Sequence, residues 1–267
     1  GSLETSIARL SSGLRVNSAK DDAAGLAIAE RMTAQIRGFD VAARNANDGI
    51  SLLQVADGAL GKIGDNLQRM RELGVQAKNG TLNDTDRANL NREFTELANE
   101  VGRVATGTTF NGNNVFASAN KTVNLQIGSG NVASDTLAVN LTSTGTAAGN
   151  DLQTTLGGAT QAAIVTAFGG VDTVANATTA ITEIDTAIND ITNLRATTGA
   201  GLSRLDQVVS SLETTSANLS SARGRIMDAD FAKETANLTR AQILQQAGTA
   251  MLAQANQLPN NVLSLLR

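Results

Sequence analysis

The stretch that decides the fold of this chain is residues 50–77, ISLLQVADGALGKIGDNLQRMRELGVQA. Its apolar residues recur at alternating intervals of three and four: Leu53, Ala56, Leu60, Ile63, Leu67 and Met70. This spacing aligns the side chains in one narrow stripe, which is typical of a helix that packs along another long helix. The stretch therefore predicts a long partner helix elsewhere in the chain.

A matching ladder lies near the other end of the sequence, in residues 202–226. Every seventh residue there is apolar: Leu205, Leu212, Leu219 and Ile226. We predict that this ladder pairs with Leu53, Leu60 and Leu67 in a coiled-coil seam between two antiparallel helices. The fold should then be mainly α, an elongated antiparallel rod with a small β-containing domain inserted at its tip.

The composition supports thin seams rather than a thick core. Only 2% of the 267 residues are aromatic, and large aromatic side chains dominate thick cores. The net charge is −4 and the charges are scattered, without the basic stripe of a nucleic-acid binder. No apolar run is long enough to cross a bilayer, so we expect neither a nucleic-acid partner nor membrane insertion.

The chain contains no cysteine and no histidine. Their absence excludes disulfides, thiol nucleophiles, histidine-based triads and almost every zinc site. Four aspartates near predicted helix starts, Asp21, Asp22, Asp228 and Asp230, are interpreted as helix caps rather than as a cation site. We therefore expect no catalytic residue, no metal and no cofactor.

In chain order, the patterns predict one helix from about residue 18 to about residue 78, opened by a capping box between Ser18 and Asp21. A second helix should begin at the caps of residues 83–85 and fold back on the first. Alternating apolar residues then predict a β-hairpin: Val123, Leu125 and Ile127 on one strand, and Leu137, Val139 and Leu141 on the other. The low-complexity residues 142–171 are expected to join this small ordered domain.

Helical periodicity returns near residue 175 and continues through the leucine ladder to a break at residues 228–230. A last helix carries Leu244, Met251 and Leu258, and Pro259 should kink or end it. We thus divide the chain into four parts. They are the first half of the rod (1–116), a variable insertion (117–173), the second half of the rod (174–232) and a terminal assembly helix (233–267).

Several separated motifs closely resemble bacterial flagellin. They are LSSGLRVNSAKDDAAGLAI (10–28), GISLLQVADGALGKIGDNLQRMRELGV (49–75), FNG (110–112), SARGRIMDADFA (221–232) and ILQQAGTAMLAQANQLPNNVLSLL (243–266). The resemblance covers both flanks, fails in the middle, and lacks most of the family's amino-terminal core helix. It implies a secreted subunit of the extracellular flagellum. The long helices would form the inner tube of the filament, the terminal helices would pair in its core, and the middle segment would decorate its outside.

The resemblance also implies partners and one surface patch. The partners are further copies of the chain in a homopolymer, a flagellar export chaperone and the filament cap. Arg69, Leu73 and Glu93 stand where the flagellin pattern places the patch sensed by Toll-like receptor 5. Arg69 and Leu73 are four residues apart and share a helix face, so contact with neighbouring subunits is the plainer interpretation of this patch.

Three functional hypotheses remain at this point. The first is a filament-forming flagellin that serves motility by self-assembly. The second is a hook–filament junction protein, which shares the terminal patterns. The third is a cell-surface flagellin homologue that binds an extracellular glycan or host ligand through its Asn-, Thr- and Gly-rich tip. The strong match of residues 49–75 favours the first.

Overall fold

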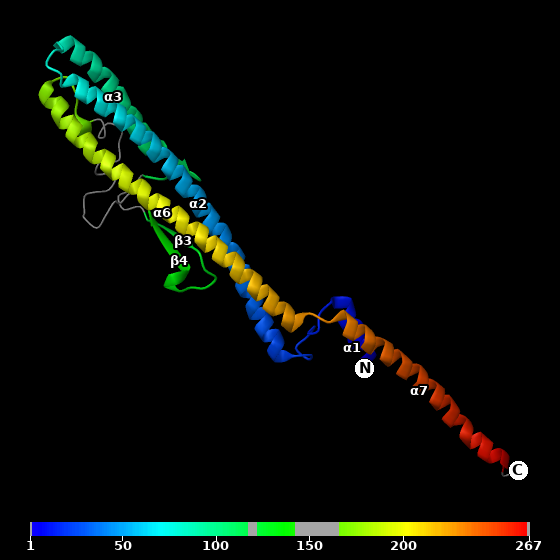
Figure 1. Ribbon diagram of the computed structural model, residues 1–267. Coiled ribbons are helices and arrows are strands. Elements are labelled where there is room, and N and C mark those ends of the chain that lie inside the picture. Colours follow the sequence, from blue (N-terminus) through cyan, green and yellow to red (C-terminus); the bar gives the residue numbers. More distant parts are fainter. Residues whose placement is uncertain (1, 117–121, 142–165, 266–267) are drawn as a thin grey trace. The chain divides into compact units, whose positions relative to one another are not determined.

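The computed structural model describes residues 2–116, 122–141 and 166–265, and the side chains of residues 3–116, 122–141 and 166–255 (Figure 1). The helices are α1 (Ser2–Ser12), α2 (Ala23–Ala77), α3 (Asp84–Gly107), α6 (Val174–Met227) and α7 (Phe231–Leu265). The short strands β1 (Thr109–Phe110) and β2 (Asn113–Asn114) pair, and β3 (Thr122–Gln126) pairs with β4 (Thr136–Asn140) beside the 3-10 turn η1 (Ala133–Asp135). The described fold is mainly α, as predicted.

The chain forms two compact units. One unit contains residues 1–38 and 214–267, and the other contains residues 39–213. Helices α2 and α6 each contribute to both units.

The core of the unit 39–213 is built from the predicted stripe on α2. Leu53, Leu60 and Leu67 are fully buried, together with apolar residues of α3, α6 and the β3–β4 hairpin. On α6 the main core residues are Ala177, Ala180, Ile184, Ala187, Ile191, Leu194 and Leu205. Leu212 is also buried, whereas Leu219 and Ile226 are half-buried in the other unit.

The partner segment predicted for residues 50–77 is wrong except at its start, where Leu205 shares the core with Leu53. Arg71 of α2 pairs with Asp185 of α6 at 2.5 Å, and Asp57 of α2 pairs with Arg195 at 2.9 Å. These two contacts run in opposite order along the chain, so the helices are antiparallel. Gly74 lies beside Ala177 and Gly201 beside Leu53, so α2 residues 50–77 face α6 residues 177–205, which overlap the ladder at 202–226 only at its start. The apolar stripes of α2 and α6 extend beyond residues 50–77 and 202–226. Periodicity alone therefore does not determine the register in which the two helices pair.

The start of α2 also differs from the prediction. The Asp21 carboxylate accepts hydrogen bonds from the backbone N–H groups of Asn17 and Ser18, so this pair closes a turn ahead of the helix. Asp22 is the cap: its carboxylate accepts the Gly25 N–H at 2.8 Å, and α2 begins at residue 23. By contrast, the predicted cap of α3 is confirmed, since Asn83 forms a reciprocal capping box with Asp86.

The predicted hairpin is confirmed. β3 and β4 are antiparallel, with Val123 opposite Val139 and Leu125 opposite Leu137. Leu125 reaches α2 at Gly49, where a Cβ atom would lie 2.3 Å from a Leu125 methyl carbon. A glycine inside α2 thus allows the hairpin to approach closely. The predicted continuation of this domain falls mainly on residues 142–165, outside the described residues, although Phe168 is buried in the core.

In the other unit, a short segment after α1 holds the break between α6 and α7. Leu14 and Asp228 form an isolated antiparallel bridge, and Gly13 adopts a positive φ of 70° just before it. The break at residues 228–230 is confirmed, and Asp230 caps α7 by accepting the N–H groups of Ala232 and Lys233. Of the two outcomes expected at Pro259, a kink or the end of the helix, the end is wrong, because α7 continues to Leu265.

Candidate assembly surface

The largest exposed apolar side chains of the described chain gather on α7. We define the assembly stripe as Ile243, Leu244, Met251 and Leu252, which are all well exposed; Leu244 is 64% and Met251 70% exposed. At about 100° per residue, Leu244 and Met251 align along α7 while Ile243 and Leu252 flank them on either side, so the four together cover about half of the helix circumference. The third predicted residue of this helix, Leu258, lies outside the residues with described side chains.

The residues around the assembly stripe are small or polar. Apart from the stripe, residues 241–255 are mainly Ala and Gln, which offer little apolar surface to cover. An exposed row of large apolar residues on a long helix marks an interaction surface, since leaving it in water forgoes its burial energy. Helix α1 packs against the amino-terminal end of α7 and leaves the assembly stripe exposed.

The patch of Arg69, Leu73 and Glu93 is only partly at the surface. Arg69 donates hydrogen bonds to Glu72 on α2 and to Glu93 on α3, each at 2.8 Å, and both carboxylates raise the pKa of Arg69 above its usual range. Leu73 is 1% exposed and belongs to the core of the unit 39–213. The accessible part of the patch is therefore a charged network of Arg69, Glu72 and Glu93 that bridges α2 and α3.

The four candidate aspartates have local structural roles. Asp22 and Asp230 cap helix starts, as predicted, whereas Asp21 closes the turn ahead of α2 and Asp228 takes part in the bridge to Leu14, so the cap prediction is wrong for these two. Among the described residues, no group of three or more carboxylates gathers in a way that could hold a metal ion.

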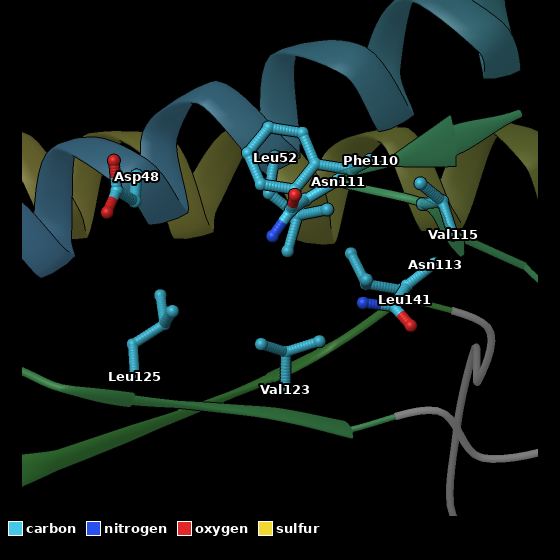
Figure 2. A pocket seen from close by; sticks show the side chains of 9 residues that line it. All are labelled: Asp48, Leu52, Phe110, Asn111, Asn113, Val115, Val123, Leu125 and Leu141. Carbon is cyan, nitrogen blue, oxygen red and sulfur yellow. The ribbon is translucent and has the colours of Figure 1, made fainter.

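A shallow cavity of about 390 Å³ lies where the hairpin and the β1–β2 turn meet α2 (Figure 2). Its wall is mostly apolar: Leu52 from α2, Phe110 and Val115 beside the turn, and Val123, Leu125 and Leu141 from the hairpin region. Asp48, Asn111 and Asn113 supply its polar atoms. Asn111 and Gly112 both have positive φ angles, which makes this turn tight enough to bring Phe110 over α2.

Two buried charges were not anticipated from the sequence. Arg87 of α3 donates to the carbonyl oxygens of Ala77 and Asn79, and Glu234 of α7 accepts from Ser6 and Arg9 of α1. Core positions are predicted from the spacing of apolar residues, and charged residues do not enter that pattern. The sequence therefore did not predict that Arg87 and Glu234 are buried.

Comparison with known proteins identifies the family. Residues 1–121 match the bacterial flagellin N-terminal helical region, and residues 181–266 match the bacterial flagellin C-terminal helical region. A flagellin of Halalkalibacterium halodurans is 45% identical over 261 residues, which cover 97% of this chain and 90% of that protein. The chain belongs to the bacterial flagellins.

Other relatives and structures agree. A Treponema pallidum flagellin is 40% identical over 274 residues, covering all of this chain and 93% of its own length. The crystal structure of Bacillus cereus flagellin, 34% identical, superposes with a TM-score of 0.52 over 63% of this flagellin and 88% of that chain. A putative flagellar hook-associated protein from Vibrio parahaemolyticus shares the fold alone, with 14% identity and a TM-score of 0.61.

Membership of the family decides the function in outline. This flagellin is a structural subunit of the bacterial flagellar filament, which lies outside the cell and serves motility. The 40–45% identity to flagellins over nearly the whole chain favours a filament subunit over a hook–filament junction protein. No helix among the described residues is long and apolar enough to cross a membrane.

Proposed function

We propose that this flagellin joins the filament through α7, whose assembly stripe is buried against neighbouring copies of the chain. The observation that supports this is the exposure of four large apolar residues on α7, of which Leu244 and Met251 align along the helix. Burying apolar surface releases about 25 cal/mol per Å², so a stripe repeated in every subunit gives a strong and cooperative drive to polymerise.

Seeded filament growth tests this proposal. Leu244→Gln with Met251→Gln removes two apolar side chains at exposed positions while keeping good helix formers, so the monomer should fold normally and elongate seeds much more slowly. Gln245→Ala, at the position next to Leu244, is the matched control and should elongate like the unmodified chain. Unimpaired growth of the double variant would show that the stripe is not the assembly surface.

The remaining partners are proposed from the resemblance. They are an export chaperone, the filament cap and Toll-like receptor 5, for a subunit that is secreted through the flagellar export route. Because Leu73 is buried, we propose that any partner of the folded chain at this patch, whether a second subunit or the receptor, contacts Arg69 and Glu93. A receptor-reporter assay with Arg69→Ala should then lose signal, whereas Arg92→Ala on α3 should not.

We also propose that the chain has no catalytic activity. The sequence lacks histidine and cysteine, and the described part of the chain shows no metal-ligating cluster. The exposed ion pairs of α2, α3 and α6 are satisfied by one another and are positioned to join helices rather than to act on a substrate.

A further inference from the structure

The most buried side chains of the packed helices α1 and α7 are polar. Among the described side chains of α1, Ser6 is the buried one, while the apolar Ile7 beside it is 49% exposed. Among those of α7, Glu234 is the buried one, at 7% exposure, while the assembly stripe is exposed. Leu3 and Leu10, on the same face of α1 as Ser6, are half-buried, as is Leu238 one turn after Glu234, so the most buried side chain of each helix is polar and has apolar neighbours on its face.

The geometry of this cluster is specific. One Glu234 carboxylate oxygen accepts a hydrogen bond from the Ser6 hydroxyl, and the other accepts from an Arg9 terminal nitrogen, each at 3.1 Å. Ser6 and Arg9 are three residues apart and so share one face of α1. Both carboxylate oxygens are therefore occupied in a single alignment of the two helices. A shift of α1 by one turn would separate Glu234 from both donors.

Such a cluster adds little net stability but strongly disfavours the wrong alignments. Removing two charges from water offsets much of the energy of a buried ion pair, whereas burying one charge without its partner carries a large penalty. A single buried polar residue is the best-attested device for fixing helix register. The surrounding surface of α7, rich in Ala, Gln and Thr, offers no comparable signal.

We propose that Glu234 is a specificity-determining residue of this flagellin, which sets the register of α1 on α7 through Ser6 and Arg9. The register decides which apolar residues of the two helices, Ile7 and the assembly stripe, are presented together to a neighbouring copy. It also positions the segment after α1. The Ala229 N–H donates to the Gly13 carbonyl at 2.9 Å, and Arg15 donates from its N–H to Met227 and from its guanidinium to Ile226. The register claim does not depend on the assembly role of α7.

The absence of cysteine allows a direct measurement of this register. Leu14 and Asp228 face each other across an antiparallel bridge, where paired Cα atoms lie about 4.5–5.5 Å apart, within the range that a disulfide spans. The double variant Leu14→Cys with Asp228→Cys should therefore form an intrachain disulfide under mild oxidation. Its rate of formation reports how often α1 occupies the native register.

Adding Glu234→Gln to this background should slow disulfide formation about tenfold or more, because the replacement keeps the shape but leaves Arg9 without its anion. Glu213→Gln, which changes an exposed carboxylate of α6, is the matched control and should leave the rate unchanged. The exchange Arg9→Glu with Glu234→Arg should restore most of the rate. Equal rates in the Glu234→Gln and Glu213→Gln backgrounds, or no recovery in the exchange variant, would overturn the proposal.

Discussion

Replacing Arg87 by alanine should destabilise the unit 39–213 more than the loss of any exposed charge. Arg87 belongs to the first turn of α3, is 7% exposed, and reaches with its side chain to the end of α2. Its Nε donates to the Ala77 carbonyl at 3.1 Å, one Nη donates to the Asn79 carbonyl at 3.3 Å, and the other lies 3.4 Å from Asp84. The side chain thus satisfies carbonyl groups that the end of α2 leaves without a helical partner.

The size of the effect follows from these contacts. A hydrogen bond to a charged group contributes about 1.5–3 kcal/mol, and its loss is felt in full only where water does not replace it. Water can reach Asn79, which is exposed, but not readily Ala77, which is fully buried. We therefore expect Arg87→Ala to lower the free energy of unfolding by about 2–4 kcal/mol.

Urea denaturation followed by circular dichroism measures this change, with the midpoint shifting at an unchanged slope. Arg92→Ala is the matched control on the same helix, because Arg92 is exposed and donates only to Asn89 one turn earlier. Its effect should stay within about 0.5 kcal/mol. Equal effects of the two substitutions would refute the idea that Arg87 closes the turn between α2 and α3.

Three further predictions concern packing, helix propensity and pH. Leu60→Ala should cost about 2–5 kcal/mol in urea denaturation because Leu60 is fully buried, whereas Val55→Ala at an exposed position of α2 should change stability by no more than about 0.5 kcal/mol. Gly58→Ala should stabilise α2 by about 0.5–1 kcal/mol because a Cβ there meets nothing within 4 Å; Gly49→Ala should gain less because the hairpin must move. Burial raises the pKa of Glu234, but the hydrogen bonds and the charge of Arg9 outweigh it, so the pKa lies below the ordinary value of 4.5. The α1–α7 contact should therefore persist above that pH and weaken as the pH falls through the lowered pKa, as measured by amide exchange of α1; the same acid step in Glu234→Gln would contradict this.

The helices were predictable because their apolar stripes are long and regular. Leu53, Leu60 and Leu67 are buried where the spacing placed them, and the alternation of Val123 and Leu125 gave the correct faces of the hairpin. The α3 cap was also predictable, since its capping box depends only on residues three apart. In each case the determining interaction is local in sequence.

What the sequence could not provide depends on interactions between distant residues. The register of α2 on α6 involves the ion pairs of Arg71 with Asp185 and of Asp57 with Arg195. Charged residues are common on helix surfaces, so the sequence does not indicate which of them form pairs. Leu73 fitted both the apolar stripe of α2 and the surface patch with Arg69 and Glu93. In the structure it is buried in the core. For the candidate site, the exposure of Leu244 and Met251 required the structure, because an apolar stripe alone does not tell a covered face from an uncovered one.

The most direct test of the central claim is an electron cryo-microscopy reconstruction of filaments grown from this chain on seeds. We predict that each subunit enters the filament with α7 packed against α7 helices of neighbouring copies, and that Leu244 and Met251 lie in those contacts. We also predict that α2 and α6 keep the antiparallel register set by Arg71 and Asp185. Failure of the chain to incorporate, or a filament in which Leu244 and Met251 face solvent, would contradict the account.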